Sequence, residues 1–155
     1  MIVSSEEETS KIAKKLARIL KNSIATICLN GELGSGKTTF SRYFIQSLLS
    51  NKITEEIPSP TFTLLQIYEG QRINIYHYDF YRLKKVEELM ELNYSESITN
   101  NICIIEWANK FKKALPEDRI EMNWIIKSKN KRLIKFNLFG SFNKKSFEWT
   151  QEKKF

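Results

Sequence analysis

Residues 31–38 read GELGSGKT, which matches the pattern G-x-x-x-x-G-K-[ST] in the setting where that pattern has a physical meaning. The run before it, residues 24–29, is short, apolar and rich in β-branched side chains, as a buried strand is. The residues after it place Phe40, Phe44 and Leu48 at helical spacing. This order of strand, glycine loop and helix predicts a P-loop that binds the phosphates of a nucleoside triphosphate.

The residue types of this loop suit phosphate and magnesium chemistry. Glycines allow the backbone to turn so that consecutive N–H groups point at the phosphates, and the helix that follows adds the positive end of its dipole. Lys37 is expected to reach the β- and γ-phosphates and to act in catalysis, and the Thr38 hydroxyl is expected to ligate Mg²⁺. The expected nucleotide contacts of the loop are Gly31, Gly34, Ser35, Gly36, Lys37, Thr38 and Thr39.

Length and composition favour a single domain. A chain of 155 residues can bury a core without disulfides or metal ions, and Cys28 and Cys103 are expected to be reduced thiols within that core. The N-terminal residues lack a signal-peptide pattern, and no apolar run approaches the about 18 residues of a membrane span. We therefore expect a soluble, cytoplasmic protein with no membrane contact.

The net charge of +7 and the isoelectric point near 9.4 indicate an attraction to phosphate ligands, nucleic acid or acidic protein surfaces. Much of the excess lies near the C-terminus, where residues 127–135 carry five positive charges. This stretch is either the solvated tip of a hairpin or a contact to RNA or a partner. Charge alone does not decide between the two.

Hydrophobic periodicity predicts the remaining elements. They are a helix over 5–21 begun by a capping box at Ser5 and Glu8, an irregular connection over 51–60, a hairpin of strands 63–69 and 72–79, a short helix over 84–92, a strand over 102–105, and a second hairpin of strands 119–128 and 132–139. The expected fold is an α/β P-loop NTPase domain over 1–140, with three layers and a mixed sheet of parallel core strands and antiparallel hairpins. Residues 141–155 form an extension for which the pattern indicates no structure.

Two carboxylates end predicted strands and complement the P-loop. A nucleotide-bound Mg²⁺ prefers oxygen ligands, and an acid at the end of a neighbouring strand usually joins the loop threonine. Glu106 follows an apolar run and matches this role better, whereas Asp79 ends a more polar strand. One of the two is expected to hold the metal while the other orients water; the alternative for each is to cap a helix.

The loop Ser59-Pro60-Thr61 lies where many nucleotide hydrolases carry a segment that senses the γ-phosphate. The alternative is a plain turn stabilised by proline and serine. His77 lies on the same face of its predicted strand as Asp79, and is expected to be either a packed, hydrogen-bonded residue or a catalytic base.

Four further residues are candidates around this site. Trp107 follows Glu106 and either lies beside the nucleotide or belongs to the core, and Thr9 of the first helix is a further expected nucleotide contact. Tyr81 and Arg82 follow Asp79, where the guanidinium either faces phosphate or forms a surface ion pair.

With these motifs in view, the chain resembles the TsaE (YjeE) family of bacterial ATPases from Ser5 to about Gly140. The glycine loop is shared by many enzymes. More restrictive are SPTF at 59–62, HYDFYRL at 77–83 and IEW at 105–107. Glu32 stands where the family commonly has Asp.

The resemblance implies an Mg²⁺-dependent ATPase that acts on a TsaB–TsaD pair during synthesis of threonylcarbamoyladenosine in tRNA. By motif, Lys37 and Thr38 hold phosphate and magnesium, Glu106 is the second metal ligand and Asp79 acts in hydrolysis. Pro60 and Thr61 belong to a nucleotide-responsive loop. Whether tRNA contacts this chain directly, or only through the complex, stays open.

Two other functions compete with this interpretation. A P-loop kinase acting on a small molecule or nucleoside would need an acceptor site and usually a lid rich in arginine, and the arginines of this sequence do not cluster. A non-catalytic RNA-binding module would use the basic C-terminal hairpin, but it would leave the glycine loop and the two strand-end acids without a purpose.

Overall fold

The computed structural model describes residues 1–49, 57–142 and 145–151. Of the irregular connection expected over 51–60, residues 51–56 lie outside this described part. None of the described helices is long and apolar enough to cross a membrane.

A seven-stranded mixed sheet forms the middle of the molecule, in the order β1-β7-β6-β2-β5-β4-β3. The strands are β1 (Ile2–Val3), β2 (Ala25–Gly31), β3 (Leu65–Tyr68), β4 (Ile75–Asp79), β5 (Ile102–Glu106), β6 (Arg119–Ser128) and β7 (Lys131–Phe139). The four central strands β6, β2, β5 and β4 run parallel, while β7 and β3 pair antiparallel with their hairpin partners. The predicted parallel core with antiparallel hairpins is confirmed.

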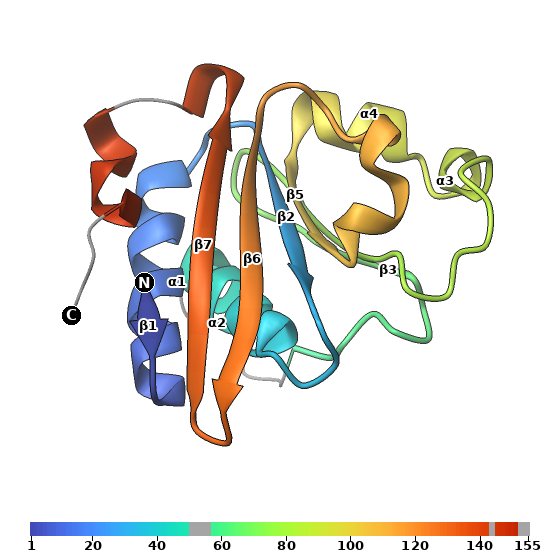
Figure 1. The fold of residues 1–155 in the computed structure, drawn as a ribbon. Helices are drawn as coiled ribbons and strands as arrows, with labels where there is room; N and C mark the ends of the chain where they lie inside the picture. The colour runs from blue at the N-terminus through green and yellow to red at the C-terminus, as the bar shows by residue number, and fades with distance from the viewer. Residues whose placement is uncertain (50–56, 143–144, 152–155) are drawn as a thin grey trace.

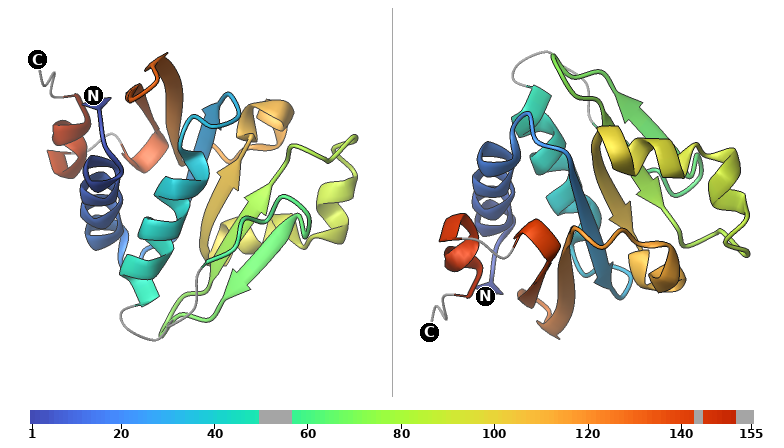
Figure 2. Two further views of the ribbon diagram at one scale, coloured as in Figure 1. Left: turned by 90° about the horizontal axis from the view of Figure 1, so that it is seen from below. Right: turned by 90° about the horizontal axis from the view of Figure 1, so that it is seen from above.

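Helices cover both faces of the sheet and make three layers (Figures 1 and 2). One face carries α1 (Glu6–Leu20) and α2 (Lys37–Leu49), and the other carries α3 (Glu88–Glu91), α4 (Tyr94–Asn100) and the 3₁₀ segment η1 (Ala108–Ala114). Two short 3₁₀ segments, η2 (Gly140–Phe142) and η3 (Lys145–Gln151), follow β7, and η3 lies beside α1 (Figure 1).

The apolar runs of β2 and β5 reflect this double cover. Along β2, Ile27 and Leu29 face the core beneath α1 and α2, whereas Cys28 faces the core beneath α4 and η1. Because both faces are buried, neither strand alternates between apolar and polar residues. The two cysteines are buried free thiols, as expected.

The start of α1 is fixed by its cap. The Ser5 hydroxyl accepts a hydrogen bond from the Glu8 N–H at 3.2 Å, as the capping box predicts. The Glu8 carboxylate accepts from the Ser4 N–H, one residue earlier than the usual partner. Ile12, Leu16 and Leu20 of the apolar stripe are buried and Ile19 is partly buried, so the predicted amphipathic helix is confirmed.

The region between β4 and β5 differs most from the prediction. The helix expected over 84–92 is reduced to α3, because the Glu88 carboxylate accepts the N–H groups of Lys84 and Lys85 and holds that segment as a turn. Val86 and Met90 of the expected apolar stripe are 44% and 79% exposed. Neither α4 nor η1 was predicted, because both are short and largely polar.

The first hairpin is antiparallel as predicted, but its strands are shorter and its connection spans 69–74. The second hairpin matches the predicted strands to within one residue.

The residues after Gly140 pack against the main body. Phe142, Phe147 and Trp149 belong to the same hydrophobic cluster as α1, α2 and the sheet. The Trp149 ring meets Phe136 of β7 edge-on at a centroid distance of 5.7 Å, and the Lys15 ammonium lies 4.5 Å above it. The segment 145–151 therefore contributes to the core over α1 and β7.

Truncating this tryptophan should destabilise the whole fold. We expect Trp149→Ala to lower the free energy of unfolding by about 3 kcal/mol, because a large buried side chain is lost and a cavity remains. Met90→Ala, at a position 79% exposed, serves as the control and should change it by no more than about 0.5 kcal/mol. Denaturant unfolding of the full chain measures both. Equal stability of the two variants would contradict the packing of this segment.

Candidate functional site

The glycine loop connects β2 to α2, and its backbone requires glycine at two points. Gly31 has φ +149° and Gly36 has φ +109°, a region that other residues rarely adopt. A Cβ atom on Gly31 would lie 2.5 Å from the carbonyl oxygen of Trp124, and one on Gly36 would lie 3.3 Å from the Trp124 ring. The loop is therefore pressed against β6, with its N–H groups at the start of α2.

The ammonium group of Lys37 is held inside this loop. Its ammonium donates to the carbonyl oxygens of Gly31 at 2.7 Å and Glu32 at 2.9 Å, and lies 4.2 Å from the centre of the Trp107 ring. Burial lowers the pKa of Lys37, and the nearby carboxylates of Glu106 and Asp79 oppose this. Its contacts are uncharged oxygens and an aromatic face. Phosphate oxygens can replace these contacts.

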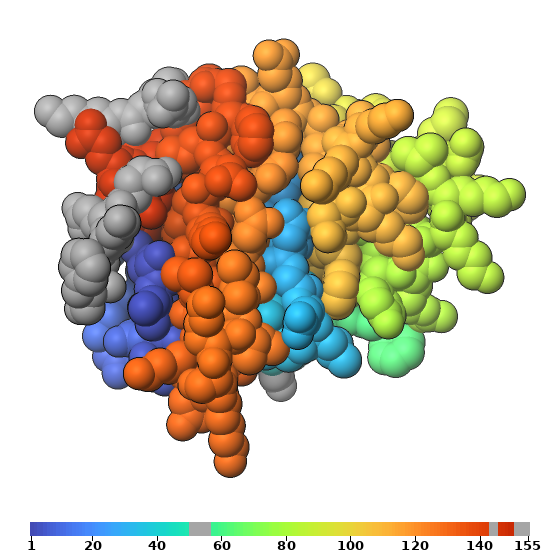
Figure 3. All heavy atoms as spheres, viewed as in Figure 1, coloured from blue at the N-terminus to red at the C-terminus, as the bar shows by residue number. Residues whose placement is uncertain are grey.

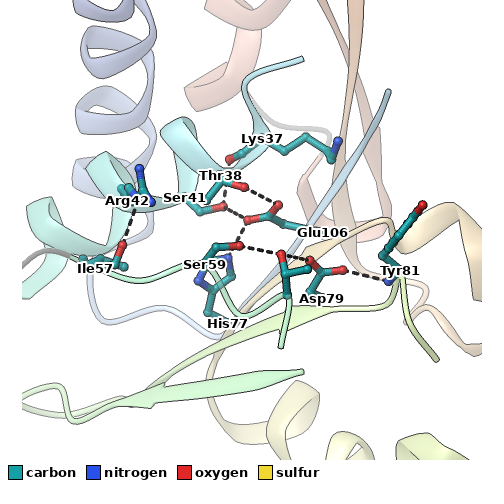
Figure 4. A network of polar contacts seen from close by, with 11 residues as sticks. Lys37, Thr38, Ser41, Arg42, Ile57, Ser59, His77, Asp79, Tyr81 and Glu106 are labelled. Carbon is teal, nitrogen blue, oxygen red and sulfur yellow. Dashed lines mark hydrogen bonds and ion pairs between the residues drawn. The ribbon is translucent and has the colours of Figure 1, made fainter. Parts of the chain in front are cut away.

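Glu106 ends β5 and faces the start of α2 (Figure 4). Its Oε2 accepts from the Thr38 hydroxyl at 2.8 Å, and its Oε1 accepts from His77 Nε2 at 2.8 Å and from the Ser41 hydroxyl at 3.3 Å. The residue is only 2% exposed. Burial alone would raise the pKa of Glu106, but the hydrogen bonds and charges around it, led by His77, lower it overall.

Asp79 ends β4 directly beside Glu106, because the parallel register pairs the two residues. Its Oδ2 accepts from the Thr61 hydroxyl at 3.0 Å and its Oδ1 accepts from the Tyr81 N–H at 2.8 Å. Burial raises the pKa of Asp79, with a further contribution from the Glu106 charge, and the two hydrogen bonds only partly offset this. Two adjacent acids thus have pKa values moved in opposite directions, a pattern typical of a division of roles.

The loop Ser59-Pro60-Thr61 is a tight turn that is also connected to this site. The Leu64 N–H donates to the Pro60 carbonyl at 2.7 Å, and the Ser59 and Thr61 hydroxyls lie 2.8 Å apart. Leu64 has φ +66°, a strained conformation for leucine. Thr61 therefore contacts Asp79 from a turn that is held by a backbone hydrogen bond and by the contact between the two hydroxyls.

The remaining sequence candidates lie at different distances from the cluster. His77 is fully buried and contacts Glu106, so it is packed and hydrogen-bonded. Trp107 lies beside Lys37, and the Tyr81 ring contacts it in a tilted arrangement at a centroid distance of 4.8 Å. Arg82 lies over the Phe62 ring at 5.4 Å, which is neither of the two contacts expected for it.

Two clefts flank the glycine loop. The first, of about 180 Å³, is lined by the loop together with Thr61, Asp79, Glu106 and Trp107. The second, of about 270 Å³, lies on the other side of the loop. Its further lining residues are Val3, Ser4, Ser5, Glu6, Thr9, Trp124, Lys129, Asn130 and Arg132. Residues 34–36 line both clefts and lie between them.

Several residues of this region were missed by sequence reasoning. Ser41 is one helical turn after Lys37, and only that spacing could have indicated it. Arg132 of the basic hairpin donates to the Gly34 carbonyl at 3.3 Å and to the Ser128 and Lys129 carbonyls at 3.1 Å each. The hairpin projects from the body of the molecule (Figure 3) and is attached to the glycine loop through this arginine.

The chain has a glycine loop between β2 and α2 and acids at the ends of the parallel strands β5 and β4. This combination places it in the class of P-loop NTPase folds. A family model described as "Threonylcarbamoyl adenosine biosynthesis protein TsaE" matches residues 3–134. The chain therefore belongs to the TsaE family of threonylcarbamoyladenosine biosynthesis proteins, which confirms the resemblance drawn from the sequence.

Individual relatives agree with this assignment. The tRNA threonylcarbamoyladenosine biosynthesis protein TsaE of Rickettsia felis is 46% identical over 134 residues, which cover 86% of this chain and 76% of that protein. The protein of the same name from Bacillus subtilis is 34% identical over 136 residues, covering 87% and 82%. A crystal structure of Bacillus subtilis YdiB superposes with a TM-score of 0.73 at 28% identity, covering 97% of this chain and 92% of that one.

The raised pKa of Asp79 predicts how stability depends on pH. An acid whose pKa is higher in the folded state than in the unfolded state destabilises the fold once pH rises above the unfolded value, because its ionised form is disfavoured where it is buried. Asp79→Asn, neutral at every pH, should therefore be more stable than the parent at pH 7. The difference should shrink as pH falls through the raised folded-state pKa and should vanish only well below the unfolded value of 3.8, where the parent side chain is protonated in both states.

Thermal unfolding at a series of pH values measures this effect. Glu87→Gln, at an exposed position, is the matched control and should follow the parent throughout. A pH-independent difference between Asp79→Asn and the parent would contradict the predicted cause.

Proposed function

We propose that this chain is the ATP-binding and ATP-hydrolysing component of the bacterial machinery that makes threonylcarbamoyladenosine in tRNA, and that it acts in the cytoplasm on a TsaB–TsaD pair. The observation that carries the proposal is the 2.8 Å contact between the Thr38 hydroxyl and Glu106. It joins the first turn after the glycine loop to an acid at a strand end, which is the oxygen pair that a nucleotide-bound Mg²⁺ requires.

The donor set suits Mg²⁺ carried by a nucleotide. Thr38 and Glu106 offer one hydroxyl and one carboxylate, and Mg²⁺ in such sites takes one or two protein oxygens and fills its other positions with phosphate and water. Within the described residues, no group of three or more His, Cys, Asp or Glu side chains could form a metal site made of protein alone. When bound, Mg²⁺ would supply charge neutralisation on the β- and γ-phosphates.

The residues of the first cleft have roles that follow from their contacts. Lys37 would leave the carbonyl oxygens of Gly31 and Glu32 and donate to the β- and γ-phosphates, while the loop N–H groups hold the same chain of phosphates. Asp79 would orient the attacking water and accept its proton, a role that its raised pKa suits. Thr61, hydrogen-bonded to Asp79, would respond to the γ-phosphate through the turn that carries it.

The second cleft suits the nucleoside part of ATP. It lies on the opposite side of residues 34–36 from the acids, and Thr9 and Trp124 belong to its lining. Lys129 and Arg132 add positive charge beside the loop, where the α-phosphate would pass. Thr9 and the loop residues are proposed nucleotide contacts on this basis, and Trp107 is proposed to line the γ-phosphate end.

Hydrolysis is favoured over transfer to a small-molecule acceptor. Among the described residues, the lining of the first cleft includes a single cation, Lys37, and no arginine of the kind that a kinase lid supplies. A cleft of about 180 Å³ also leaves little room for an acceptor beside the terminal phosphates.

Substitutions at the two acids should separate nucleotide binding from hydrolysis. Glu106→Gln should weaken Mg²⁺-dependent ATP binding by about 10-fold or more, since a metal ligand is lost. Asp79→Asn should bind ATP nearly as the parent does but hydrolyse it about 100-fold more slowly, as expected when a general base is removed. Binding of a fluorescent ATP analogue and release of phosphate measure the two quantities.

Two further variants serve as controls. Lys37→Ala should abolish both binding and hydrolysis. Lys14→Ala, at an exposed position of α1, should change neither. Equal binding defects in the two acid variants would refute the division of roles.

The ATPase should depend on the partner proteins. One domain with a complete nucleotide site leaves little chain for a second substrate pocket, so nucleotide state must be sensed by another protein. A purified TsaB–TsaD pair should raise the ATPase rate of this chain, and tRNA modification should stop after a few turnovers when the chain is omitted. An unchanged ATPase together with normal modification cycles would refute the proposed function, and phosphate transfer to added nucleosides would then support a kinase.

A further inference from the structure

His77 is buried directly behind Glu106. It lies on β4, two residues before Asp79, and is 0% exposed. Its Nε2 lies 2.8 Å from Glu106 Oε1, on the side of the carboxylate away from Thr38 (Figure 4). His77 is absent from the lining of the first cleft, so it does not meet the nucleotide itself.

We propose that His77 is a positioning residue: its Nε2–H holds Oε1 of Glu106, so that Oε2 stays beside the Thr38 hydroxyl, where Mg²⁺ binds. An ionised carboxylate only accepts hydrogen bonds, so the contact requires the hydrogen to be on Nε2. Carboxylates that ligate metals are commonly oriented by such a partner. This inference rests on the proposed function, because it assumes that Glu106 ligates the metal of the bound nucleotide.

The other donor to the same oxygen cannot replace His77. The Ser41 hydroxyl lies 3.3 Å from Oε1, but it also donates to the Lys37 carbonyl at 3.0 Å, as helical serines do. A hydroxyl has one hydrogen and cannot serve both oxygens fully. The shorter contact from His77 is therefore the main restraint on the orientation of the carboxylate.

The opposite ring nitrogen supports a specific purpose for histidine. His77 Nδ1 is buried with no hydrogen-bond partner in the described part of the chain. A side chain present only for packing would not leave a polar atom unpaired, since that costs stability. Within the described residues, the contact at Nε2 is therefore the hydrogen bond that fixes the His77 ring.

Glutamine and asparagine offer a matched pair of replacements. In glutamine the amide nitrogen is separated from Cβ by the same number of bonds as Nε2 is in histidine, so it can donate to Glu106. In asparagine the amide nitrogen takes the place of Nδ1 and falls short of the carboxylate. Both variants are neutral and bury one amide, so packing and polarity are closely balanced between them. His77→Leu removes every donor.

Mg²⁺ affinity is the quantity to measure, as the Mg²⁺ concentration that restores binding of a fluorescent ADP analogue after EDTA treatment. His77→Asn and His77→Leu should need about 10- to 100-fold more Mg²⁺ than the parent, whereas His77→Gln should stay within about 3-fold. Binding in EDTA reports on the fold of the site without metal. A loss in EDTA that parallels the loss in Mg²⁺, or equal Mg²⁺ requirements in Gln and Asn variants, would overturn the inference.

A measurement on the unaltered protein does not depend on variants that fold. The sequence contains a single histidine, so ¹⁵N-histidine labelling gives one imidazole spectrum. The spectrum should show the proton on Nε2, and adding Mg²⁺ with ADP should shift this signal more than ADP in EDTA does. An unprotonated Nε2, or identical spectra with and without Mg²⁺, would overturn the inference. If the parent binds the analogue equally with and without Mg²⁺, the proposed magnesium function itself fails.

Discussion

The parallel pairing of β2, β5 and β4 is the constraint on which the site depends. It brings the carboxyl ends of three strands to one edge of the sheet, where Glu106 pairs with Asp79 on one side and with Leu29, two residues before Gly31, on the other. The helix that follows β2 then begins at this edge and presents Thr38 to Glu106. The groups proposed to hold phosphate, metal and water therefore lie at one edge of the sheet.

The same edge collects polar groups that a core would otherwise exclude. Lys37, His77, Asp79 and Glu106 are all at most 4% exposed. Burying such groups is unfavourable unless they are hydrogen-bonded, and almost all of their polar atoms have partners in Thr38, Thr61, Ser41 and the loop carbonyls. Two hydrophobic clusters, one on each face of the sheet, bury apolar surface and so offset this cost.

Glu106 and Asp79 are chemically similar, but their pKa values move in opposite directions because their surroundings differ. Glu106 accepts from His77, Thr38 and Ser41, and its pKa is lowered, which favours the ionised form that a metal requires. Asp79 is buried next to that charge with two hydrogen bonds, and its pKa is raised, which favours proton transfer. The proposed metal ligand and the proposed proton acceptor are thus adjacent residues on paired strands.

Local patterns in the sequence determined the glycine loop, the cap of α1, the apolar strands and both hairpins, because each depends on residues within about one turn or one strand of each other. They also determined the family, through short motifs around Ser59, His77 and Glu106. They did not determine α4 or η1, whose polar sequences carry no periodic signal, and they overestimated α3, because the capping of Lys84 and Lys85 by Glu88 was not visible as a pattern.

Only the tertiary structure decided which side chains meet. The contacts of Thr61 with Asp79, of His77 with Glu106 and of Arg132 with Gly34 join residues 18, 29 and 98 positions apart. No local rule predicts such pairs, since they depend on strand register and on how the hairpin folds back over the loop. The sequence alone therefore left two interpretations of His77. The tertiary structure places it against Glu106, which is its hydrogen-bond partner.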